Sequence, residues 1–164
     1  TKRITSGDST NIEAQAAKVY WSMLFQNFTR HLDEQDIRNS ALNYGYAIMR
    51  GMIARALVGV GFLPAFGLHH HSELNALNLA DDIIEPFRPF VDVLVKELLA
   101  EDKGTLPLTL PIHYKTRLLE IPFIPCIVGS TQTTLAYACE LCAESLLRAT
   151  KAKDATLIET VSFL

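Results

Sequence analysis

Apolar residues recur at helical spacing along most of the chain and predict an all-α fold. From about residue 10 to 30 they follow steps of three and four, as on one face of a helix capped by Ser9, Thr10 or Asn11 (Ile12, Ala16, Val19, Tyr20, Met23 and Phe28). A second stretch, about residues 40–60, is apolar on most sides. Because such a helix belongs in the centre of a bundle, we expect a helical bundle around this segment.

A loop and an interrupted helix follow. Residues 61–71 contain two glycines and a proline and end in three histidines, which predicts a loop. Helical spacing resumes over about 75–100, with Pro86 and Pro89 inside it. Since each proline removes a backbone donor and crowds the preceding turn, we expect a kink or break near Glu85–Pro89.

The C-terminal third combines a proline-rich connection with one strong helix. Residues 102–129 contain four prolines and predict a long irregular connection, with room for a short helix at 113–119 and one strand pair. The last helix is expected over about 131–152, and the tail at 155–164 is expected to add a short helix.

Length and composition fit a single domain in a reducing compartment. The 164 residues are 49% hydrophobic, enough for one core, and three cysteines are too few for a disulfide framework. The first residues lack a signal-peptide pattern, so we expect a cytoplasmic protein, and the missing initial Met suggests a fragment. Arg50 and Arg55 interrupt the longest apolar stretch, so no membrane segment is predicted.

The net charge of −3 counts against binding to nucleic acid, because phosphate binding usually leaves a basic footprint. A site for divalent cations would weaken this objection. Its carboxylates lower the net charge of the domain, while the metal itself presents positive charge to phosphate.

Three carboxylates lie within one and a half helical turns and are candidates for such a site. Asp81 and Asp82 are four and three residues before Glu85, so each shares a helix face with it. Like charges at this spacing repel, which suggests a cation between them: a metal ion, or Arg88 or another base. A solvated acidic turn paired with an arginine is the simpler alternative.

The histidine triplet and one glutamate complete the candidates. An imidazole from His69, His70 or His71 together with carboxylates suits Mn²⁺ or Zn²⁺ and tolerates Mg²⁺ less readily. An exposed polar loop, or a single core histidine, would explain the triplet equally well. Glu13 lies at the edge of the expected buried face of the first helix, where the helix dipole alone would favour an acid.

Other motifs favour structural explanations. Cys139-x-x-Cys142 lies on an apolar helical stripe and is typical of core packing. Gly59-x-Gly61 precedes no helix start, so it predicts no phosphate-binding loop. A small basic cluster near the end of the last helix matches the helix dipole (Arg148, Lys151 and Lys153).

Three segments resemble the C-terminal, all-helical catalytic domain of the CRISPR-associated integrase that inserts new spacers into the repeat array, most closely that of type II systems. The first is DSTNIEAQAAKVYW at residues 8–21, and the second is NYGY at 43–46 with the apolar helix after it. The third comprises GLHH at 67–70 and NLADDIIEPFRP at 78–89. They occur in the family's order and with its gaps.

The resemblance implies that Glu13, His70 and Glu85 are catalytic metal ligands, with Asp82 as a second acid that could replace Glu85 as the direct ligand. It implies Mg²⁺ or Mn²⁺ as cofactor, and cleavage or transesterification of DNA in prokaryotic adaptive immunity. Arg88 and Lys18 are candidates for holding the phosphate.

The implied partners are double-stranded spacer and repeat DNA, a second copy of the complete protein, and the small ferredoxin-like companion protein of spacer acquisition. We expect residues 1–164 to be one helical catalytic domain without the family's N-terminal β-rich domain, which leaves the activity of the isolated domain open. The alternatives are a helical interaction module with a structural metal site and a helical nucleotide hydrolase.

Overall fold

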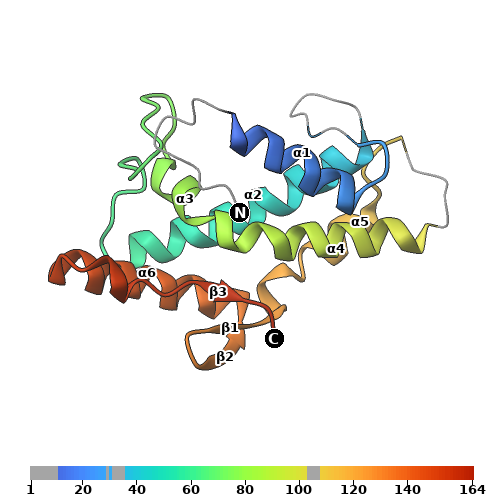
Figure 1. The fold of residues 1–164 in the computed structure, drawn as a ribbon. Coiled ribbons are helices and arrows are strands. Elements are labelled where there is room, and N and C mark those ends of the chain that lie inside the picture. The colour runs from blue at the N-terminus through green and yellow to red at the C-terminus, as the bar shows by residue number, and fades with distance from the viewer. Residues whose placement is uncertain (1–10, 29, 31–35, 103–107) are drawn as a thin grey trace.

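The computed structural model describes residues 11–28, 30, 36–102 and 108–164, and within them the chain is mostly helical with a small antiparallel sheet (Figure 1). This agrees with the predicted helical bundle, to which the sheet is an addition. The elements in chain order are α1 (Ile12–Leu24), α2 (Ile37–Gly59), α3 (Asn78–Ile83), η1 (Glu85–Phe87), α4 (Arg88–Glu101), α5 (Ile112–Leu118), η2 (Ile121–Phe123), β1 (Pro125–Val128), β2 (Thr131–Thr134), α6 (Leu135–Ala152), η3 (Ala155–Leu157) and β3 (Val161–Ser162).

The predicted central helix is confirmed as α2, which packs against α3, α4, α5 and α6. It begins at Ile37, a few residues earlier than expected, because the Asp36 side chain caps it by accepting the backbone N–H of Arg38 at 2.8 Å. At Gly45 a Cβ would lie 2.5 Å from Val91 Cγ1 of α4, so the missing side chain lets the two helices approach closely. No helix in the described ranges has the length and hydropathy of a membrane span.

The expected break near Glu85–Pro89 is confirmed. The helix predicted over 75–100 is divided into α3, the 3₁₀ turn η1 and α4. Pro86 and Pro89 each occupy the first turn of the element that follows, where a backbone donor has no intrahelical partner to lose. Glu85 thereby stands at the junction of two helices instead of inside one.

The C-terminal region differs from the sequence prediction in two places. The expected strand pair forms from β1 and β2, but the last helix begins at Leu135 and not at 131, since Thr131–Thr134 pair with β1 across a turn at Gly129 (φ 59°). The short helix predicted in the tail is confirmed only as the single 3₁₀ turn η3 (Ala155–Leu157). After η3 the chain extends as β3, which adds to the other edge of β1 and buries Val161.

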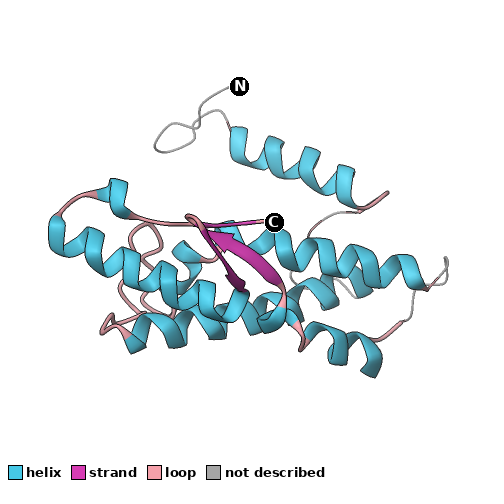
Figure 2. Cartoon of the chain, turned by 90° about the horizontal axis from the view of Figure 1, so that it is seen from below, coloured by secondary structure: helices cyan, strands magenta, loops and turns pink. Residues whose placement is uncertain are grey.

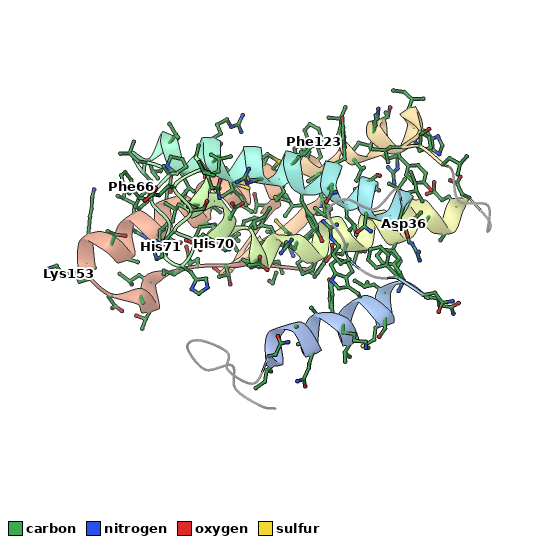
Figure 3. The ribbon with its side chains drawn as sticks, turned by 90° about the horizontal axis from the view of Figure 1, so that it is seen from above. Asp36, Phe66, His70, His71, Phe123 and Lys153 are labelled. Atoms are coloured by element: carbon green, nitrogen blue, oxygen red, sulfur yellow. The ribbon has the colours of Figure 1, made fainter. Side chains whose placement is uncertain are left out.

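Helix α1 is shorter and more exposed than predicted. It ends at Leu24, because Phe25 adopts an extended backbone and Asn27 a left-handed one (φ 50°). The apolar stripe was expected to face the core, yet Val19 is 59% and Met23 78% exposed. Figures 2 and 3 both show α1 as a layer outside the other helices. The expected caps Ser9 and Thr10 lie outside the described residues.

Candidate functional site

The loop that carries the three histidines folds over the carboxylate of Asp82, whose side chain is 6% exposed. This carboxylate accepts the backbone N–H groups of Leu68 at 2.5 Å and of His69 and His70 at 3.1 Å each. Burial alone would raise the pKa of Asp82, but the hydrogen bonds from the loop outweigh it and lower the pKa. The charged carboxylate therefore holds the loop on α3.

His70 is singled out from its neighbours by its side chain. Its Nδ1 lies 2.6 Å from Asp82 Oδ1, while the ring remains 48% exposed. Pairing with a carboxylate assigns the proton to Nδ1 and leaves Nε2 as the nitrogen with a lone pair. His69 packs edge-on against the His70 ring, and His71 is exposed. Figure 3 shows His70 and His71 side by side, at the end of the molecule where Lys153 closes α6.

Two further residues shape this loop, and the sequence analysis did not single them out. A Cβ at Gly67 would lie 2.3 Å from the carbonyl oxygen of His70 and 2.8 Å from Asp82 Oδ2, so only glycine fits there. The amide of the buried Asn78 donates to the carbonyl oxygens of Ala65 at 2.9 Å and Ser72 at 2.8 Å, one on each side of the histidines. The glycine just before the histidines was the available sequence signal.

Glu85 faces a different way from Asp82, because the chain changes to a 3₁₀ turn between them. Its side chain is 60% exposed and accepts a hydrogen bond from Arg88 Nη1 at 2.8 Å. Glu85 and His70 line one cavity of about 500 Å³ between α2, α3 and the histidine loop. The structure thus brings two of the predicted ligands to one cavity.

Asp81, the third acid of the cluster, is paired within the protein. It accepts Arg50 Nε at 2.6 Å and the Asn75 amide at 2.7 Å, and these bonds keep its pKa low although burial opposes them. The sequence suggested one cation shared by the acids. Instead the acids have separate partners: Arg50 for Asp81, His70 and backbone N–H groups for Asp82, and Arg88 for Glu85.

Basic side chains line the same cavity. Arg30, Arg50 and Arg88 all contribute to it, and the guanidinium of Arg88 lies 4.7 Å from the centre of the Tyr46 ring. Arg30 donates to the amide oxygen of Asn43 at 2.5 Å. The cavity therefore contains both charges: Arg50 and Arg88 are paired with Asp81 and Glu85, and Arg30 adds a further positive charge.

The third predicted ligand, Glu13, lies in the first turn of α1, and its side chain is outside the described part of the chain. Ala16 and Ala17, one turn further along α1, line a second cavity of about 350 Å³. Glu85 and Arg88 line this cavity too and so separate it from the first. Among the side chains that are described, no cluster of three His, Cys, Asp or Glu residues is placed to hold a metal ion.

Asp92 of α4 is buried beside the second cavity, and the sequence analysis missed it. It is 2% exposed and accepts the hydroxyl groups of Tyr20, at 2.5 Å, and of Tyr46. Burial raises the pKa of Asp92, and the two tyrosines oppose that rise. Its position beside the apolar stripe of α4 gave no sign of this role.

The cysteines and Arg148 of the terminal basic cluster make contacts within the fold. Cys139 and Cys142 are buried free thiols of the core, as predicted, and burial raises the pKa of both to about 12. Arg148 pairs with Glu159 at 2.9 Å, next to the sheet.

Comparison with known proteins gives consistent matches. The family model described as CRISPR associated protein Cas1 matches residues 5–106. The CRISPR-associated endonuclease Cas1 of Neisseria meningitidis serogroup C (strain 8013) is 49% identical over 107 residues, which cover 65% of this chain and 34% of that protein. A CRISPR-associated endonuclease Cas1 of Saccharolobus solfataricus is 37% identical over 91 residues, covering 49% of this chain and 26% of that protein.

A solved structure has the same fold. A casposase bound to an integration product superposes with a TM-score of 0.73 and 22% identity, over 92% of this chain and 52% of that one. At this identity the match supports the fold alone. The chain spans about a third or less of the length of these two curated relatives.

Proposed function

This chain belongs to the CRISPR associated protein Cas1 family, and on that premise we propose that it holds the metal site of a DNA endonuclease and integrase. The proposed ligands are Glu13, His70 and Glu85. The observation that carries the proposal is the cavity in which His70, oriented by Asp82, faces the same space as Glu85.

The donor set fits a divalent cation. Metal-binding histidines usually donate their other ring N–H to a carboxylate, which fixes the ring and raises the basicity of the ligating nitrogen. Asp82 makes this contact with His70, and its oxygens also accept backbone N–H groups. We therefore assign Asp82 to orienting His70. Glu85 is the direct ligand, because its exposed carboxylate is held by an arginine that a cation can displace.

The course of α1 supports Glu13 as the remaining ligand. Residues three and four apart share a helix face, and Ala16 and Ala17 occupy those positions relative to Glu13. They line a cavity together with Glu85. The face of α1 that carries Ala16 and Ala17 thus borders the same cavity as Glu85, which supports Glu13 as a ligand.

The reaction we propose is phosphodiester chemistry on double-stranded DNA. A bound Mg²⁺ or Mn²⁺ would act as a Lewis acid on the phosphoryl oxygen and stabilise the leaving 3′-oxygen. Arg88 and Arg30 hold the phosphate by charge-assisted hydrogen bonds. Attack by the 3′-hydroxyl of a spacer end on the repeat boundary joins the two DNAs, and attack by water cuts the strand. A homodimer of the complete protein and the ferredoxin-like companion are the proposed partners.

The test compares His70→Ala with His71→Ala in the complete protein. Loss of an outer-shell partner typically costs about 10- to 100-fold in metal affinity or activity, so loss of a ligand should cost at least about 100-fold. Mn²⁺-dependent cleavage and strand transfer should vanish in His70→Ala and remain within about twofold of wild type in His71→Ala, with both variants folded. Equal activity of the two variants would contradict the assignment.

A further inference from the structure

The side chain of Asp92 connects three helices. It belongs to α4, receives the Tyr20 hydroxyl from α1 at 2.5 Å, and receives the Tyr46 hydroxyl from α2. A carboxylate that is 2% exposed is costly to bury unless it is hydrogen-bonded. Both tyrosine hydroxyls provide such bonds, so the cluster is satisfied only when α1 lies in its observed position.

The rest of α1 is loosely attached. Val19 and Met23 on the helix are mostly exposed, and the aromatic packing gathers at its end, where Trp21 stacks on Phe25 with ring centres 6.3 Å apart. Trp21 and Phe25 both belong to the end of α1, so their stacking does not by itself attach the helix to its neighbours. The Tyr20–Asp92 hydrogen bond joins the middle of α1 directly to α4 and so restrains its position.

The position of Tyr20 links this bond to the proposed metal site. Tyr20 is seven residues, about two turns, after Glu13, and residues at that spacing lie on one face. Asp92 is likewise seven residues after Glu85. The Tyr20–Asp92 bond thus joins α1, which bears the proposed ligand Glu13, to α4, which follows the proposed ligand Glu85.

We propose that Asp92 is a positioning residue that, by holding Tyr20, fixes the position of α1, and with it that of residue 13, relative to Glu85. The inference rests on the proposed function, and it assigns no contact between Asp92 and metal or DNA. A loosened α1 would supply its ligand only part of the time, so apparent metal affinity falls in proportion to the fraction of correctly placed helix.

The experiment uses Tyr20→Phe, Asp92→Asn and the double variant in the complete protein, with Tyr114→Phe as the matched control. Tyr114 also donates its hydroxyl to a carboxylate, that of Asp102, at 2.6 Å, but it lines neither cavity. The measurements are the Mn²⁺ concentration for half-maximal strand transfer, Mn²⁺ binding by calorimetry, and Tm.

Tyr20→Phe should raise the Mn²⁺ requirement by up to about tenfold, the limit set by losing a hydrogen bond to a charged group, with the rate recovering at saturating Mn²⁺. Tyr114→Phe should leave the requirement unchanged whatever its Tm. The double variant should lose no more than the more affected single variant, because Tyr20→Phe removes the contact and Asp92→Asn weakens the same contact by removing the charge of its acceptor. If Asp92→Asn fails to fold, Tyr20→Phe still decides, because that residue is partly exposed.

Two outcomes overturn the proposal in distinguishable ways. Wild-type Mn²⁺ dependence in Tyr20→Phe, in a protein whose wild type binds Mn²⁺, refutes the positioning role and leaves the metal site standing. A wild-type protein that neither binds Mn²⁺ nor acts on DNA with it refutes the proposed function and this inference with it.

Discussion

Gly67→Ala is the sharpest test of how the histidine loop is held. The added methyl group would lie 2.3 Å from the His70 carbonyl oxygen and 2.8 Å from Asp82 Oδ2. Neither atom can yield freely, since the first is backbone and the second accepts the backbone N–H groups of Leu68 and His69. The loop must therefore lift from Asp82 by about 1 Å to restore van der Waals separation.

Overpacking of this kind costs about 1–3 kcal/mol, which for a domain of this size lowers Tm by about 2–12 °C. Because His70 loses its oriented contact, metal-dependent activity should fall about 10- to 100-fold. Gly51→Ala is the matched control: nothing lies within 4 Å of its Cβ position on the helix α2, so alanine should stabilise by about 0.5–1 kcal/mol. Thermal unfolding and a Mn²⁺-dependent cleavage assay measure both effects. Wild-type Tm and activity in Gly67→Ala would refute the proposed clamp.

Three further predictions concern other parts of the chain. Asp36→Ala should cost about 1 kcal/mol of unfolding free energy at pH 7 through loss of the α2 cap. Hydrogen bonding lowers the pKa of Asp36, so its contribution to stability is complete above the ordinary carboxyl range and disappears as pH falls through the lowered pKa. Urea unfolding curves of wild type and variant should therefore converge at low pH. Cys139 should resist alkylation at pH 8 in the folded protein and react after unfolding, since burial raises its pKa to about 12; rapid native labelling, followed by mass spectrometry, would argue against the core. Arg88→Gln in the complete protein should weaken DNA binding and reduce the salt slope by about one, and an unchanged slope in a salt titration would remove Arg88 from the phosphate contacts.

Local signals in the sequence predicted the parts of the fold that depend on local chemistry. Pro86 and Pro89 act on their own turns, so the break at Glu85 was visible without any tertiary information. The glycines and the proline before the histidines likewise predicted a loop. The apolar surplus of residues 40–60 indicated a central helix, because a helix that is apolar on most sides must be covered by neighbouring elements on most sides.

Tertiary choices were not visible in the same way. Periodicity showed which residues of α1 share a face but not whether another helix covers that face, and Val19 and Met23 proved exposed. The sequence of Thr131–Thr134 is compatible with the start of a helix, but in the structure this segment pairs with β1 as a strand. The burial of Asp92 depends on two tyrosines from other helices, which no local pattern reveals.

The roles of Asp82 and Glu85 remained undecided in the sequence for a related reason. Asp82 and Glu85 are three residues apart, and on a continuous helix this spacing would place both on one face. Their different surroundings arise from the loop that returns over Asp82 and from the 3₁₀ turn at Glu85. The proposed roles of Glu85 as direct ligand and Asp82 as orienting acid rest on these surroundings, which form only when the chain has folded.

The ion pair between Glu85 and Arg88 has a thermodynamic consequence for the order of assembly. A cation that takes Glu85 sets Arg88 free, and an anion that takes Arg88 sets Glu85 free, so each ligand removes a competitor of the other. Occupancy at the two positions is therefore mutually reinforcing, and the coupling is reciprocal. Because an exposed pair is worth about 0.2–1 kcal/mol, the cooperativity amounts to no more than about fivefold and weakens with salt.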